Sequence, residues 1–99
     1  MEKEIEQLNK FIGQVPVKIE KKDNKLNLSF VKKVLFIKKE VNFVIEPNES
    51  IERLNVKSLQ GKNLKSVDYK EPYLNLVFKK EGGLDFTLSI KIKELNIVK

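Results

Sequence analysis

Apolar and polar residues alternate along most of this chain, which is the pattern of β-strands with one buried and one solvent-facing side. The clearest run extends from Leu84 to Ile92, where every second residue is apolar. The same alternation is present over 15–19 and 26–30, and Val41–Ile45 gives a shorter run. Polar or glycine-containing segments separate these runs, so the pattern predicts strands joined by hairpin turns.

Helices are expected at the start of the chain and near its middle. Four apolar residues recur at steps of three and four, as on one face of a helix: Met1, Ile5, Leu8 and Ile12. Gly13 is placed to end this helix. A second, less regular helix is expected after Pro47, with Ile51 and Leu54 on one face.

The chain also carries an internal repeat. Three blocks recur in one order. Ile5–Asn9 recurs as Ile51–Asn55, and Phe11–Gln14 with Leu26–Phe30 recurs as Leu59–Lys62 with Leu74–Phe78. In the third block, Lys38–Glu40 before Val41–Ile45 recurs as Lys79–Glu81 before Leu84–Leu88. The first copy has seven extra residues, Val31 to Ile37, which have no counterpart in the second. This pattern predicts that residues 4–46 and 50–89 are two copies of one structural unit.

Each copy consists of an expected helix followed by three expected strands, which gives an α+β fold. A chain of 99 residues makes a single domain, 1–99. One copy is too small to bury its own apolar face. We therefore expect the two α-β-β-β units to form one antiparallel sheet of six or more strands, or a partly closed barrel, covered by the helices. The expected core consists of apolar residues from both copies: Ile5, Leu8, Ile19, Leu26, Leu28, Phe30, Phe43, Ile51, Leu54, Val67, Leu74, Leu76, Phe78, Phe86 and Leu88.

Part of the second copy is similar to known repeat proteins. Gly61-Lys62, Val67, Tyr73–Phe78 and Leu84 resemble short repeats in small bacterial and phage proteins, some of which lie in toxin–immunity or phage-related gene neighbourhoods. The resemblance consists of glycines and strand hydrophobics. It implies a repeat fold and an immunity-like role, and it brings no catalytic signature.

The composition excludes several kinds of chemistry. The chain contains no His and no Cys, so no thiol or imidazole catalysis is available, and no zinc, haem or iron–sulfur site can be built from those ligands. Asp23, Asp68 and Asp85 fall in separate predicted elements, and no glycine-rich phosphate loop is present. We therefore expect no enzyme activity, no cofactor and no metal.

Positive charge is concentrated in the first copy. The net charge is +6, and Arg53 is the one basic residue that is not a lysine. Against Glu20 and Asp23, the segment 18–39 carries eight lysines: Lys18, Lys21, Lys22, Lys25, Lys32, Lys33, Lys38 and Lys39. Such a ridge could bind a phosphate backbone without reading bases. Alternatively, these lysines protect exposed strand edges against aggregation.

One predicted loop of the second copy is a candidate partner-binding site. Both tyrosines of the chain, Tyr69 and Tyr73, flank this loop, which also contains Lys70 and Pro72. Tyrosine is favoured at the centre of interfaces because it combines a large rigid surface with a polar tip. Alternatively, the two rings cover the edge of the sheet.

The extra segment of the first copy is a second candidate. Val34–Ile37 are four consecutive apolar residues between two pairs of lysines. They form either a strand that is buried on both faces or an exposed strip that binds a partner. In the second case, Val34 and Phe36 are the expected contact residues.

Together these observations favour a non-enzymatic binding protein that acts by occupying a macromolecular partner, as an inhibitor of the immunity or anti-defence type does. The expected partner is a protein, and a homodimer is compatible with the sequence. The alternatives are sequence-nonspecific nucleic-acid binding through the lysines, or sequestration of a small anionic ligand. The chain starts without a signal peptide pattern and has no apolar run long enough to span a membrane, so we expect a cytoplasmic protein without a membrane partner.

Overall fold

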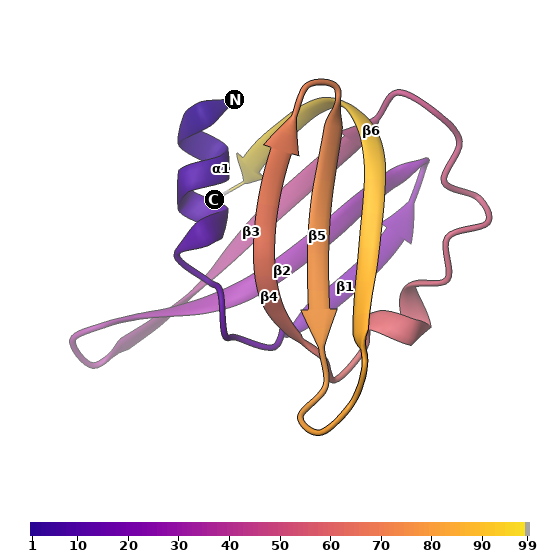
Figure 1. Ribbon diagram of the computed structural model, residues 1–99. Helices are drawn as coiled ribbons and strands as arrows, with labels where there is room; N and C mark the ends of the chain where they lie inside the picture. Colours follow the sequence, from indigo (N-terminus) through magenta and orange to yellow (C-terminus); the bar gives the residue numbers. More distant parts are fainter. Residues whose placement is uncertain (99) are drawn as a thin grey trace.

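Six antiparallel strands form one bent sheet around a short helix (Figure 1). The computed structural model describes residues 1–98. Its elements in chain order are α1 (Glu2–Asn9), β1 (Lys18–Lys22), β2 (Lys25–Val34), β3 (Ile37–Pro47), the 3₁₀ helix η1 (Val56–Leu59), β4 (Asn63–Lys70), β5 (Tyr73–Lys79) and β6 (Asp85–Val98). The expected α+β class with a six-stranded antiparallel sheet is therefore confirmed at this level.

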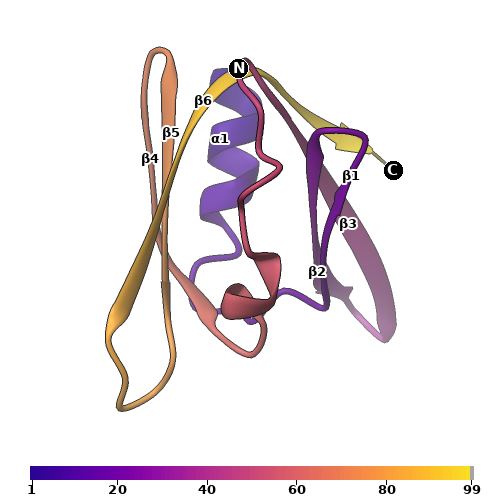
Figure 2. The same cartoon turned by 90° about the vertical axis from the view of Figure 1, so that its right-hand side faces the viewer.

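The strand order is β1-β2-β3-β6-β5-β4, and β6 joins the two halves. Its first part, Asp85–Lys91, pairs with β5, whereas its second part, Ile92–Val98, pairs with β3. The sheet bends along this strand, so that β1–β3 and β4–β5 face each other with α1 and η1 between them (Figure 2). The sheet is open, because β1 and β4 are its two edge strands and do not pair with each other.

The expectation that helices cover the sheet is wrong. Among residues 1–98, α1 is the one α-helix, and the second copy contributes only the four-residue η1. The apolar face of each half of the sheet is covered mainly by the other half. In the segment after Pro47, the Asn24 side chain accepts a hydrogen bond from the Ile51 N–H at 2.9 Å and donates one to the Glu49 carbonyl at 2.9 Å. These bonds hold the segment after Pro47 against the β1–β2 turn in a non-helical conformation.

The first helix is also shorter than its apolar spacing predicts. It ends at Asn9, and the chain then turns, so that Phe11 is buried whereas Ile12 is exposed. Gly13 has a φ of 97° and donates a hydrogen bond to the Leu64 carbonyl at 2.7 Å. The N–H of Leu64 in turn donates to the Gln14 carbonyl at 2.9 Å, which attaches this segment to the edge of β4.

The alternation over 15–19 becomes regular strand only from Lys18 onward. Val15 and Val17 precede β1 and are exposed, although the pattern placed them on a buried face.

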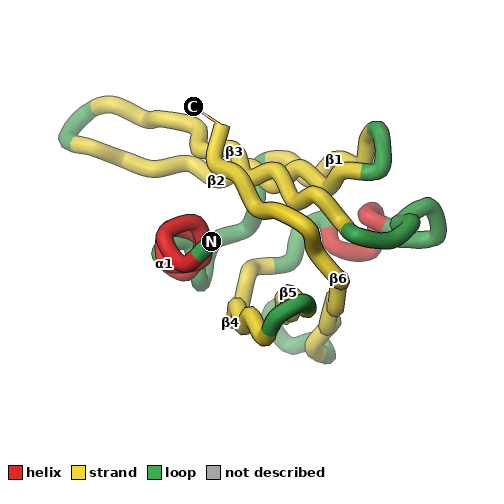
Figure 3. Tube along the Cα trace, turned by 90° about the horizontal axis from the view of Figure 1, so that it is seen from above, coloured by secondary structure: helices red, strands yellow, loops and turns green. Residues whose placement is uncertain are grey.

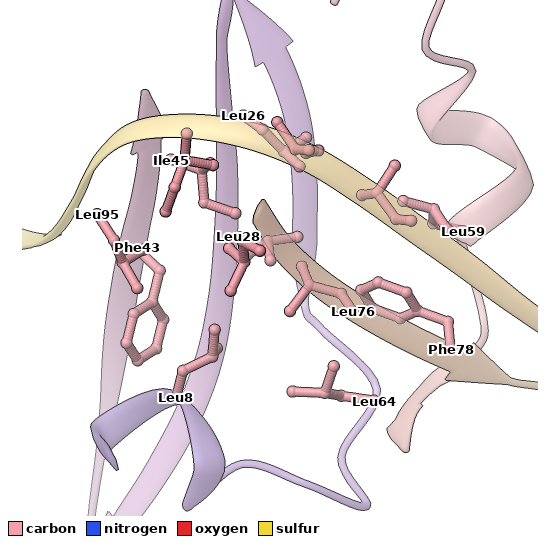
Figure 4. Packing of buried hydrophobic residues seen from close by; sticks show 14 of the residues in the cluster. Leu8, Leu26, Leu28, Phe43, Ile45, Leu59, Leu64, Leu76, Phe78 and Leu95 are labelled. Atoms are coloured by element: carbon pink, nitrogen blue, oxygen red, sulfur yellow. The ribbon is translucent and has the colours of Figure 1, made fainter. Parts of the chain in front are cut away.

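One apolar cluster fills the space between the two halves of the sheet. Figure 4 shows Leu28 of β2 and Leu76 of β5 pointing into this common interior. The Phe11 and Phe30 rings stack with their centres 5.0 Å apart, and Phe43 lies edge-on to both. Every residue of the expected core is buried or packs against the cluster. The buried residues that the sequence analysis missed are Phe11, Ile45, Leu59, Leu64, Ile90, Ile92 and Leu95.

The order of the strands bears on the predicted repeat. In each half, three consecutive strands form a meander, and the third strand of each lies at the centre of the sheet. β3 and β6 therefore occupy equivalent positions, as do β2 and β5. This arrangement is what two joined copies would produce, and the duplication itself stays a prediction.

Candidate functional site

The β2–β3 hairpin extends beyond the sheet. β1 pairs with β2 only as far as Ser29, and β6 pairs with β3 only from Asn42 onward. Between these points residues 31–34 pair with 37–40, and in the described part of the chain no other strand pairs with them. We call residues 31–40 the arm. It projects at the lower left of Figure 1 and runs past α1 in Figure 3. All of its residues except Val31 are exposed.

The tip of the arm, Val34–Ile37, is entirely apolar. Val34 and Ile37 pair with each other, and Leu35 and Phe36 form the turn between them. Leu35 is 92 % exposed and Phe36 is 103 % exposed relative to their reference areas, so the protein covers neither side chain. The run of four apolar residues is therefore not a strand buried on both faces.

The backbone conformation at Leu35, in the turn of the tip, is unfavourable for leucine. Leu35 has a φ of 58°, a conformation that disfavours residues with a Cβ atom and that glycine or asparagine normally occupies in such turns. The β1–β2 turn shows the usual solution, since its two positive-φ residues are Asp23 and Asn24. The leucine at the tip therefore does not serve the formation of the turn.

Four lysines surround the base of the tip, and we call them the lysine collar: Lys32, Lys33, Lys38 and Lys39. Lys32 is directly opposite Lys39, and Lys33 is directly opposite Lys38. Because side chains alternate along a strand, the first pair lies on the face that continues the core side of the sheet, and the second pair lies on the outer face.

The positively charged side chains of the lysine collar repel one another. Like charges in directly opposite positions destabilise a strand pair. Among residues 1–98, none of the four ammonium groups lies within ion-pair distance of a carboxylate. The collar therefore presents positive charge that no described group of the protein neutralises.

A groove of about 910 Å³ separates α1 from the core-side face of the arm. Phe11, Val41 and Ile97 give it an apolar floor, and Lys3 and Gln7 of α1 lie on one wall. The opposite wall is formed by the arm itself: Lys32, Val34 and Lys39. The arm thus has open space on both of its faces.

The other four lysines do not continue the collar. Lys18 forms an ion pair with Glu20, with 3.1 Å between Nζ and Oε2. Lys21 donates hydrogen bonds to the carbonyls of Glu52 at 2.7 Å and Leu54 at 2.8 Å, so it holds the segment after β3 in place.

Lys22 and Lys25 are exposed and lie opposite each other at the far end of β2. Eight residues separate Lys25 from Lys33, or roughly 27 Å of extended strand. The collar lies at one end of β2 and Lys22 and Lys25 lie at the other, whereas Lys18, opposite Ser29 between them, is paired with Glu20. The eight lysines therefore do not form one continuous ridge of unpaired charge.

The two tyrosines lie on opposite faces of the β4–β5 hairpin. Tyr69 is opposite Leu74 and packs against the core, whereas Tyr73 is opposite Lys70 and is exposed on the outer face. The carbonyl of Pro72 accepts a hydrogen bond from the Ile92 N–H at 2.8 Å, which ties the turn to β6. Of the four candidate residues of this loop, Lys70 and Tyr73 are exposed, whereas Tyr69 and Pro72 are half-buried.

The acidic residues are dispersed. Within residues 1–98, no three acidic side chains gather in a way that could hold a metal ion. The Asp85 carboxylate accepts a hydrogen bond from the Lys65 Nζ at 2.8 Å. This bond, together with the positive charge of Lys65 and Lys79, lowers the pKa of Asp85 below its ordinary value.

The tip of the arm contains exposed apolar residues that the sequence analysis did not single out. Val34 and Phe36 were expected, but Leu35 is also fully exposed and Ile37 is largely exposed. One signal was available in the symmetry of the segment, Lys-Lys-Val-Leu-Phe-Ile-Lys-Lys, which folds back on itself about the bond between residues 35 and 36. The groove had no such signal, because α1 and the arm meet only in the folded protein.

Comparisons of the chain with models of protein families, with curated proteins and with solved structures find no match. No helix within residues 1–98 is long and apolar enough to cross a membrane.

Proposed function

We propose that this chain is a non-enzymatic binding protein that occupies the surface of a protein partner with its arm. The observation that carries the proposal is the apolar tip, in which Leu35 and Phe36 are fully exposed on a projecting hairpin. Contiguous exposed apolar residues mark interaction sites in soluble proteins. Burying a side chain of this kind contributes about 1.5–3 kcal/mol, so the two residues alone supply a substantial part of a binding free energy.

Two destabilising features of the arm support the same proposal. A leucine at positive φ and two pairs of opposed lysines each destabilise the isolated hairpin. Such features occur where function requires them, and here they place apolar groups and positive charge at the most accessible point of the molecule. A protein of this kind acts by blocking its partner, which is the way in which an immunity or anti-defence inhibitor works.

The test is capture of a partner by matched variants. Tagged wild-type protein, the Leu35→Ser/Phe36→Ser variant and the Leu84→Ser variant are incubated with a nuclease-treated extract of the cell that carries the gene. Leu84 is the matched control, because it is 91 % exposed at the β5–β6 turn, away from the arm. We expect the wild type and the Leu84 variant to retain the same protein and the double variant to lose it. Equal retention by all three variants would contradict the proposal.

Nucleic-acid binding is the second candidate, and the lysine collar favours it. The grooves of duplex DNA admit a two-stranded β-ribbon, and some proteins wedge an apolar tip between base steps. Neutralising four phosphates would give a slope of about −3.6 for log K against log salt. Titration of the protein with duplex DNA at several salt concentrations measures this slope, and the Lys32→Gln/Lys39→Gln variant should reduce it by about half.

A further inference from the structure

We infer that the arm binds as a plug: its tip enters an apolar pocket of an acidic protein, carboxylates at the rim of that pocket pair with the lysine collar, and one wall of the pocket occupies the groove beside α1. This inference rests on the proposed function and names the chemistry of the partner's site. It follows from three properties of the arm, which are its fully exposed apolar tip, its charge on both faces and the open space on its core side.

The tip demands an environment that surrounds it. Val34 and Ile37 point to the face shared with Lys32 and Lys39, while Leu35 and Phe36 extend beyond the last strand pair. A flat partner surface would cover one face of this ribbon and leave the other face in water. A concave pocket removes the whole tip from water, and binding energy concentrates at such fully desolvated anchors.

The charge of the collar specifies the rim of the pocket. Both faces of the arm carry a lysine pair immediately behind the apolar tip. When the tip is inserted, these ammonium groups come to the mouth of the pocket on both sides. Carboxylates placed there relieve the repulsion between opposed lysines and accelerate association by electrostatic attraction.

The groove provides room for the pocket wall. A pocket that encloses the arm must send one wall along the core-side face, between Val34 and α1. The groove of about 910 Å³ lies at this place, with Phe11 and Ile97 on its floor. Lys3, Lys32 and Lys39 outnumber Glu4 and Glu40 along its borders, so an acidic segment with apolar side chains fits it better than a basic one.

Two other occupants fit less well. A second copy of this chain would bring another net charge of +6 and another unneutralised collar against the first. A nucleic-acid backbone would neutralise the collar but would leave most of the four-residue apolar tip without an apolar environment. An acidic protein accounts for the tip, the collar and the groove together.

Two cross-linking reactions in the same extract test the inference. Phe36 is replaced by p-benzoyl-phenylalanine, which on illumination attaches any protein that surrounds the tip. Separately, a water-soluble carbodiimide joins lysine amines to carboxylates in direct contact. The charge-preserving variant Lys32→Arg/Lys33→Arg/Lys38→Arg/Lys39→Arg removes the four reactive amines, and Lys22→Arg/Lys25→Arg is its control at the far end of β2.

We expect one protein to be attached at position 36, and the same protein to be joined through its Asp or Glu residues to the collar. The arginine variant of the collar should lose the carbodiimide product, whereas the Lys22/Lys25 control should keep it. With the partner in hand, Gln7→Trp, which narrows the groove without altering the arm, should weaken binding by about tenfold or more.

The outcomes separate the inference from the proposed function. Attachment of a protein at position 36 without carbodiimide products at the collar overturns the plug and leaves the protein-binding function standing. Full affinity of the Gln7→Trp variant likewise overturns it, because the groove would then be empty in the complex. Attachment at position 36 of a second copy or of nothing removes both the inference and the proposed function.

Discussion

The β2–β3 and β5–β6 connections occupy equivalent places in the two halves of the sheet, but they are built from opposite kinds of residue. The β5–β6 connection turns within Lys80–Leu84, with Gly82 at a φ of 75°. The Gly83 N–H donates a hydrogen bond to the Lys80 carbonyl at 2.8 Å. The β2–β3 connection instead continues as the arm and turns at Leu35, whose positive φ would be unstrained for a glycine.

The difference shows what the sheet needs and what it does not. Phe30 and Phe78 are fully buried at equivalent points just before the two connections diverge. Beyond Phe78 a short glycine turn is sufficient. Beyond Phe30 the chain adds residues of which none is fully buried, so the arm contributes almost nothing to the interior. The arm therefore adds exposed apolar surface without adding core, and the proposed partner contact rests on this difference.

The largest expected effect tests whether the two halves share one interior. Phe30→Ala and Phe78→Ala should each lower the free energy of unfolding by about 3–5 kcal/mol, because each leaves a cavity in the same cluster. Urea denaturation followed by circular dichroism measures both changes. A large loss for one variant and a negligible loss for the other would show that the halves are stabilised independently.

Removing the arm tests its separation from the fold. If residues 32–39 are replaced by Asn-Gly, Val31 and Glu40 remain opposite each other across a two-residue turn. We expect partner binding to be abolished while the free energy of unfolding changes by less than about 1 kcal/mol, because only exposed residues are lost. Thermal unfolding and partner capture check the two halves of this prediction. A shortened protein that no longer folds would show that the arm supports the core.

Exchanging the turn residues sharpens the comparison further. Leu35→Gly relieves the strain of the positive φ and should raise the free energy of unfolding by up to about 1 kcal/mol, while it weakens partner binding. Gly82→Ala should lower the free energy of unfolding by about 1 kcal/mol without affecting partner binding, because open space surrounds that position and only the backbone is strained. Denaturation and binding measured on the same samples would contradict the prediction if Leu35→Gly lowered stability.

The smallest effect concerns the ion pair at the start of β6. Hydrogen bonding to Lys65 lowers the pKa of Asp85 below the ordinary value of 3.8. Its contribution is therefore present above that value and is lost as the pH falls through the lower pKa of the folded state. Both side chains are exposed, so we expect Asp85→Asn to reduce stability only slightly at neutral pH and by less at pH 2. Unfolding curves at the two pH values measure the difference.

Much of the secondary structure could be predicted because its signals are local. Alternation over 26–30 and 84–92 identifies strands, since successive side chains must point to opposite faces. The local pattern predicts the helices less well, because the expected helix with Ile51 and Leu54 does not form and α1 ends before Ile12. In both places the chain makes hydrogen bonds to distant residues, from Asn24 and Leu64, which no local pattern contains.

The candidate site could be predicted only in part. Sequence alone singled out Val34 and Phe36, and it identified the lysines on either side of them. It did not distinguish a strand buried on both faces from an exposed tip, because both have the same run of apolar residues. It also grouped eight lysines, of which the fold engages Lys18 and Lys21 in bonds within the protein and leaves the collar at one end of β2, away from Lys22 and Lys25.

By itself, the sequence determined that this chain is rich in β-strand and has no thiol or imidazole chemistry, because composition and periodicity depend only on which residues are present and how they are spaced. Tertiary structure alone decided that β3 lies beside β6, that the sheet ends before residues 31–40, and that α1 stands across a groove from the arm. These facts depend on which distant strands pair and where that pairing stops. The free energy that sets those limits comes from the shared core and not from the arm's own residues.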